Sequence, residues 1–125
     1  MNEKTTSQAI LSRMEKAMNA HDLDAFADCF AENLRSYQPL HPQRGVIDHA
    51  KMRENWGGLF AHVPDLVAAV RRSVVDGDQV WAEWEIGGTT VENTRYLSCG
   101  VTILTLENDR IASVRFYLDN VDMAD

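Results

Sequence analysis

The second half of the chain contains three long strand-like runs, and this feature constrains the fold most. The runs cover residues 80–86, 96–106 and 110–119, whereas the first half has the apolar spacing of helices. Helices followed by a meander of strands are typical of an α+β domain whose helices cover one face of an antiparallel sheet. We therefore predict an α+β fold with a cone-shaped, curved, mostly antiparallel sheet wrapped around N-terminal helices. We expect the cone to hold a small molecule.

The length, composition and charge of the chain indicate a single folded domain and argue against nucleic acid binding. A chain of 125 residues fits a single domain, which we place at 1–125. The hydrophobic fraction of 45% excludes global disorder. The net charge of −7 and a single adjacent basic pair, Arg71-Arg72, argue against nucleic acid as a partner.

The cysteines and the N-terminal residues bear on the cellular compartment. Cys29 and Cys99 are far apart in apolar contexts, so we expect two buried free thiols in a reducing compartment. Met1 to Gln8 has no signal-peptide core, and no apolar run approaches the roughly 20 residues of a membrane span. We expect a soluble cytoplasmic protein with no membrane partner.

Apolar spacing predicts three helices in the first half. Asp22 is a good N-cap for a short second helix through Phe30, and Asp48 for a third helix that ends at the segment 63–65. The residues expected to face inward are Ile10, Met14, Ala17 and Met18 on the first helix and Met52, Trp56, Leu59 and Phe60 on the third.

The strand pattern assigns faces to the sheet. We predict strands at 34–40 and 66–75, a hairpin turn at 76–78, and a break in the next strand at Gly87-Gly88. Strict alternation in this last strand should place one set of residues inside, Val80, Ala82, Trp84 and Ile86, and another outside, Trp81, Glu83 and Glu85.

Several marker segments, in this order, resemble the SnoaL-like (polyketide cyclase-like) branch of the nuclear transport factor 2-like superfamily. The segments are 19–26, 30–33, Gln38-Pro39, Gly45, 81–88 and 109–119. The resemblance covers nearly the whole chain and implies the same cone-shaped fold. It does not select an activity, because the superfamily includes isomerases, cyclases, dehydratases, epoxide hydrolases and proteins without catalysis.

The catalytic groups of the related steroid isomerases are not present at the matching positions. The resemblance aligns their catalytic aspartate with Gln38, their oxyanion-hole tyrosine with Met14 and their oxyanion-hole aspartic acid with Thr102. Steroid isomerisation is therefore not expected. SnoaL-type cyclases carry an acidic residue on the last strand, for which Asp119 is the nearest match. If Val114, Phe116 and Leu118 face the pocket, Asp119 should point away from it.

The candidate acid/base groups are His41 and Asp119. His41 lies in the loop at the rim of the cone, and histidine is suited to proton transfer near neutral pH. The alternative is a solvent-exposed loop histidine. Tyr37 and Gln38 share this rim and would orient a substrate.

The candidate binding wall combines aromatic and hydroxyl side chains. Trp56, Phe60 and Trp84 would give an aromatic lining, although ordinary core packing explains the same spacing. Ser98 and Thr102 should face inward, where their hydroxyls bind either a ligand or neighbouring protein groups.

Other residues indicate a partner surface. Trp81 among Glu83 and Glu85 suits a homodimer interface on the outer sheet face, which the resemblance also implies. No metal-binding or phosphate-cradling motif is present, so we expect no metal and no cofactor.

The sequence therefore predicts a protein that binds a small, largely apolar molecule in a conical pocket. Acid/base chemistry such as isomerisation, cyclisation or hydration is the expected activity if it is an enzyme. The alternative is a non-catalytic dimeric ligand-binding or association module. An enzyme of this type needs at least one ionisable group facing the cavity.

Overall fold

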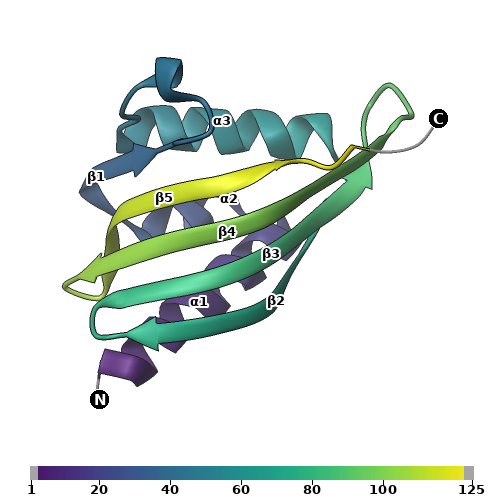
Figure 1. Cartoon of the computed structure of the whole chain (residues 1–125). Coiled ribbons are helices and arrows are strands. Elements are labelled where there is room, and N and C mark those ends of the chain that lie inside the picture. The colour runs from purple at the N-terminus through teal and green to yellow at the C-terminus, as the bar shows by residue number, and fades with distance from the viewer. Residues whose placement is uncertain (1–2, 123–125) are drawn as a thin grey trace.

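The computed structural model describes residues 3–122 and has the predicted α+β architecture (Figure 1). Its helices are α1 (Glu3–Ala20), α2 (Leu23–Asp28), the 3₁₀ helix η1 (Pro42–Arg44) and α3 (His49–His62), and its strands are β1 (Phe30–Tyr37), β2 (Val67–Asp76), β3 (Gln79–Thr89), β4 (Arg95–Glu107) and β5 (Arg110–Asn120). Within residues 3–122, no helix is long and apolar enough to cross a membrane.

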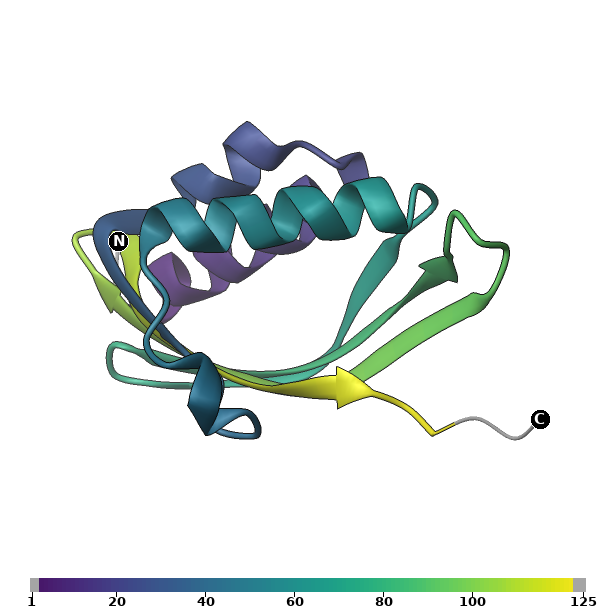
Figure 2. The same ribbon diagram turned by 90° about the horizontal axis from the view of Figure 1, so that it is seen from above.

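The five strands form one sheet in the order β1-β5-β4-β3-β2. Only the β1–β5 pair is parallel, and the other three pairs are antiparallel. The sheet curves, and α1, α2 and α3 all lie on its concave side (Figure 2). The prediction of a curved, mostly antiparallel sheet around N-terminal helices is therefore confirmed.

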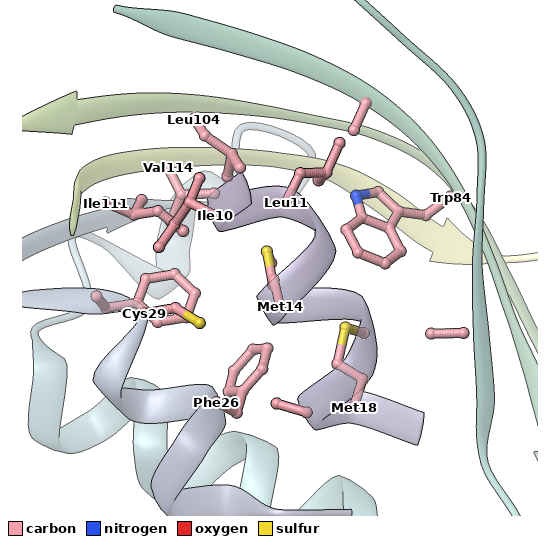
Figure 3. Close-up of a cluster of buried hydrophobic side chains, with 14 of the residues drawn as sticks. Ile10, Leu11, Met14, Met18, Phe26, Cys29, Trp84, Leu104, Ile111 and Val114 are labelled. Atoms are coloured by element: carbon pink, nitrogen blue, oxygen red, sulfur yellow. The ribbon is translucent and has the colours of Figure 1, made fainter. Parts of the chain in front are cut away.

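The main core lies between α1 and the middle of the sheet (Figure 3). The predicted inward stripe of α1 is buried, with Met14 and Met18 each 1% exposed. Trp84 is also 1% exposed, and its Nε1 donates a hydrogen bond to Thr102 Oγ1 at 2.9 Å. Ser98, Thr102 and Leu104 are buried along β4. The alternation rule therefore assigned the faces of β3 and β4 correctly.

The N-caps of α2 and α3 are as predicted, but the C-terminal end of α2 is not. The Asp22 side chain accepts from Ala25 N at the start of α2, and the Asp48 side chain accepts from Lys51 N at the start of α3. The second helix does not continue through Phe30, because Phe30 already pairs with Ile111 as the first residue of β1. The predicted strand at 34–40 consequently begins at 30 and ends at 37.

Two further expectations from the sequence are wrong. Gly87-Gly88 does not break β3, which continues to Thr89. A Cβ on Gly88 would lie 2.5 Å from Val63 Cγ1, so glycine allows the α3–β2 connection to pack directly on the strand. Cys29 is buried as expected, but Cys99 is exposed. Cys99 pairs with Glu85 and therefore shares the outward face of the sheet.

Candidate active site

A pocket of about 320 Å³ lies at one end of the sheet, where it borders the core through Ile47, Met52 and Ile86. One face of α3, the β1–α3 connection and the ends of β3, β4 and β5 form its walls. The lining residues are Ser36, Gln38, His41, Arg44, Ile47, Met52, Asn55, Trp56, Leu59, Ile86, Tyr96, Ser98, Phe116, Leu118, Asp119 and Asn120. The volume is at the small end of the range for ligand sites, and aromatic and aliphatic walls with a few polar groups are typical of them.

Local backbone structure fixes the connection between β1 and α3. Pro42 starts the 3₁₀ helix η1, in which Arg44 N donates to His41 O at 3.0 Å. Gly45 ends it with φ of 69°, a conformation that glycine adopts without strain. Two backbone hydrogen bonds then join Ile47 to Ser36, at 2.8 and 2.9 Å. The connection is thus tied back to β1 and holds His41 at the mouth of the pocket.

His41 and Asp119, the two predicted acid/base residues, are in direct contact. His41 Nε2 lies 3.1 Å from Asp119 Oδ2, and the two side chains are 27% and 52% exposed. Their contact joins residues 78 positions apart in the sequence. We describe them below as the His41–Asp119 pair.

The expectation that Asp119 points away from the pocket is wrong. Phe116 and Leu118 line the pocket, and so does Asp119. The last residue of β1 paired with β5 is Tyr37, opposite Arg115. Beyond Arg115, no strand in residues 3–122 pairs with β5 on that side, which leaves room for His41 to contact the Asp119 carboxylate.

Hydrogen bonds and charges favour the ionised form of Asp119. Its Oδ1 accepts from Asn120 N at 2.8 Å, and this bond, with the nearby His41 and Arg44, lowers the pKa of the Asp119 carboxyl. Burial raises the pKa of the Tyr96 phenol. At neutral pH the pocket therefore presents a carboxylate beside His41 and a neutral phenol on the neighbouring strand β4.

Polar side chains around the pair make up the rest of the rim. Arg44 Nη1 donates to Gln38 Oε1, and Ser98 Oγ donates to the Asp119 carbonyl oxygen at 3.1 Å. Arg44 and Asn55 were not predicted as site residues. The sequence signal for Arg44 is its position three residues after His41 in a turn that Pro42 starts and Gly45 ends.

Of the nine predicted site residues, the structure brings together His41, Asp119, Gln38, Trp56 and Ser98 around the pocket. Four others lie elsewhere. Tyr37 points to the opposite face, where Arg35 Nε donates to its hydroxyl at 2.9 Å. Phe60 stacks on the His21 ring at 5.5 Å between centroids. Trp84 and Thr102 pair with each other in the core.

The outer face of the sheet carries the residues predicted to form a dimer interface. Trp81 is 46% exposed there. Glu83 pairs with Arg72 at 2.9 Å, and Glu85 pairs with Arg71 at 2.7 Å, both within the chain. The described part of the chain contains no group of three His, Cys, Asp or Glu side chains that could hold a metal ion.

Solved structures with the same fold span almost the whole chain. A Bacillus subtilis protein assigned as an isomerase has a TM-score of 0.83 at 19% identity, covering 95% of this chain and 90% of its own. IdmH from Streptomyces antibioticus, assigned as a polyketide cyclase, has a TM-score of 0.77 at 18% identity, covering 90% and 91%. An NTF2-like protein of unknown function from Cytophaga hutchinsonii has a TM-score of 0.68 at 15% identity, covering 90% and 89%. At these identities the similarity shows the fold alone.

Sequence comparison gives the family. No curated protein is significantly similar to the chain. The model of the SnoaL-like domain matches residues 11–114, which include α2, α3 and the first four strands, and the resemblance noted from the marker segments is thereby confirmed. The chain therefore belongs to the SnoaL-like domain family.

Proposed function

We propose that this protein binds a small, largely apolar molecule in the pocket and transfers a proton on it without a cofactor. The reaction class is isomerisation, cyclisation or hydration. The observation that carries the proposal is the 3.1 Å contact between His41 Nε2 and Asp119 Oδ2 at the pocket mouth. A histidine oriented by a carboxylate is a common general base.

The charge state of Asp119 determines which nitrogen of His41 can act as a base. An ionised carboxylate only accepts hydrogen bonds, so Nε2 carries the hydrogen in the neutral imidazole. Nδ1 then keeps its lone pair and accepts a proton from the substrate or, in a hydration, from the water molecule that adds to it. The resulting imidazolium is stabilised by Asp119 and returns the proton to another atom of the substrate, which balances the reaction.

The remaining lining supports an apolar substrate with one or two polar groups. Trp56, Leu59, Phe116 and Leu118 provide the apolar wall. Ser98 and Tyr96 provide hydroxyl groups on β4, and Gln38 provides an amide at the rim. We propose that these three polar side chains orient the substrate relative to His41. Phe60, Trp84 and Thr102, which the sequence placed in the binding wall, and Tyr37, which it placed at the rim, do not line this pocket.

Proton exchange tests the proposal without knowledge of the natural substrate. The probe is 2-tetralone, a bicyclic ketone with acidic α-hydrogens, in deuterated buffer followed by ¹H NMR. The wild-type protein should accelerate exchange, and His41→Ala and Asp119→Asn should each lower the rate by about 10²-fold or more, the usual scale for a general base. The exposed His62 does not line the pocket, so His62→Ala should keep the wild-type rate.

The alternative is a non-catalytic ligand-binding module. It predicts no acceleration by the wild-type protein, or equal rates in wild type and His41→Ala. Four ionisable residues line the pocket, His41, Arg44, Tyr96 and Asp119, and they favour the enzyme.

We also propose that two copies associate through the outer sheet face around Trp81. Light scattering should then give about twice the chain mass of 14.1 kDa. Trp81→Asp should reduce the mass to that of one chain, because it places a charge at the centre of the apolar contact. Val91, an exposed apolar residue in the β3–β4 loop, provides the control Val91→Asp. A monomeric wild-type protein would contradict the proposal.

Two further expectations from the sequence stay predictions. One is that residues 1–125 form a single SnoaL-like domain, of which the family match covers 11–114. The other is a cytoplasmic location.

A further inference from the structure

Arg44 and His41 project from the same short turn into the pocket. His41 is the N-cap of η1, and Arg44 is the last residue of this helix, three positions later. Both line the pocket. Figure 2 shows this connection running from the sheet edge to the start of α3. A permanent positive charge therefore lies on the rim beside the proposed base.

Arg44 forms no ion pair with the described residues, although its charge acts on the Asp119 carboxylate from a greater distance. Acidic residues outnumber basic ones in the chain by 19 to 12, and other arginines use this excess, as Arg53 does with Asp24. Within residues 3–122, Arg44 has no carboxylate within ion-pair distance. Its hydrogen-bond partner is the neutral Gln38 amide, which occupies one of the five guanidinium N–H groups.

A second hollow adjoins the pocket and shares Arg44 with it. It has a volume of about 570 Å³, and its lining residues are Gln38, Arg44, Val46, Ile47, Asp48, Lys51 and Asn55. Four of these residues, Gln38, Arg44, Ile47 and Asn55, also line the first pocket. Arg44 thus stands where the two hollows meet, with the aromatic and aliphatic residues Trp56, Phe116 and Leu118 in the first of them.

We infer that the ligand of this pocket is a carboxylic acid with an apolar ring system. The ring lies against Trp56, Phe116 and Leu118, and the carboxylate binds the free N–H groups of Arg44. Guanidinium and carboxylate are matched in shape and form paired hydrogen bonds. The inference rests on the proposed small-molecule function of the same pocket and names its substrate class.

Paired probes that differ only in charge test the inference. The probes are 2-naphthoate and the neutral 2-naphthamide, and the readout is the ratio of their dissociation constants from isothermal titration calorimetry. The wild-type protein should bind the acid at least about tenfold more tightly than the amide, which is the scale of a charge-assisted hydrogen bond. Arg44→Gln should bring the two constants to within about twofold.

Two further variants distinguish a direct contact between Arg44 and the ligand carboxylate from a general effect of positive charge. Arg72→Gln removes the same charge from the outer face of the sheet and should keep the wild-type ratio. Arg44→Lys keeps the charge but loses the paired geometry, so its ratio should lie between those of wild type and Arg44→Gln.

The results separate this inference from the proposed function. A preference for the acid that depends on Arg44 supports the inference even if the protein does not accelerate proton exchange. Equal affinities in the wild-type protein, an unchanged ratio in Arg44→Gln, or no binding of either probe at millimolar concentration overturns it.

Discussion

The closed core beneath the middle of the sheet and the open pocket at one end of it differ in how their polar groups are satisfied. Beneath the middle of the sheet, Trp84 and Thr102 satisfy each other and both are at most 1% exposed. At one end of the sheet, the polar groups of His41, Asp119 and Arg44 line an open pocket. In both regions, the side chains come from the inward-facing positions of β3 and β4. The difference arises because α1 fills one part of the concave face, whereas α3 and the β1–α3 connection leave a space at the other.

Substitutions in the closed core should mainly change stability, whereas substitutions around the pocket should mainly change ligand binding. The closed region is built from buried side chains such as Met14, Met18 and Trp84 (Figure 3). A substitution in the closed region leaves a cavity or an unpaired polar group, whereas one in the open region changes a surface that water already reaches.

The largest expected difference is between two tryptophans. Trp84→Ala should lower the free energy of unfolding by about 3–5 kcal/mol, because it leaves a cavity in the closed region. Trp56 lines the pocket and packs on Phe26 at 4.7 Å between ring centroids, so Trp56→Ala should cost less. Urea denaturation measures both. Equal losses of stability would contradict the distinction between the two regions.

A smaller difference is expected between two buried hydroxyl residues of β4. Thr102→Val keeps the volume but leaves the Trp84 Nε1–H unpaired, which should lower the free energy of unfolding by about 1–3 kcal/mol. Ser98 donates to the Asp119 carbonyl oxygen beside the open pocket, where water can replace it. Ser98→Ala should therefore cost less than about 1 kcal/mol. The reverse order, again from urea denaturation, would show that the pocket end is as closed as the core.

The sequence predicted the regular parts of the molecule because local patterns determine them. The 3.6-residue spacing of Ile10, Met14 and Met18 and the alternation from Val80 to Ile86 depend only on neighbouring residues. These elements form as predicted. The continuation of β3 through Gly87-Gly88 was missed, because it depends on pairing with Leu97 and Tyr96 of β4.

The site was predicted less completely for the same physical reason. His41 was a candidate from its residue type and Asp119 from the family resemblance, but their contact depends on β1 ending before β5 does. Arg44 was missed because its direction depends on the turn between Pro42 and Gly45. Trp84 and Thr102 have the residue types and inward parity of a binding wall. Whether such a residue lies in the core or in the pocket depends on which part of the concave face is covered by α1. Local sequence patterns do not contain this information.

The most direct test of the account is the protonation state of the two His41 nitrogens. Long-range ¹H–¹⁵N correlation spectra distinguish them, at a pH above the range in which histidine side chains ordinarily titrate. The account predicts hydrogen on Nε2 and a bare Nδ1 in the wild-type protein, and loss of this preference in Asp119→Asn. Hydrogen on Nδ1 in the wild-type protein, or the same spectrum in Asp119→Asn, would contradict it.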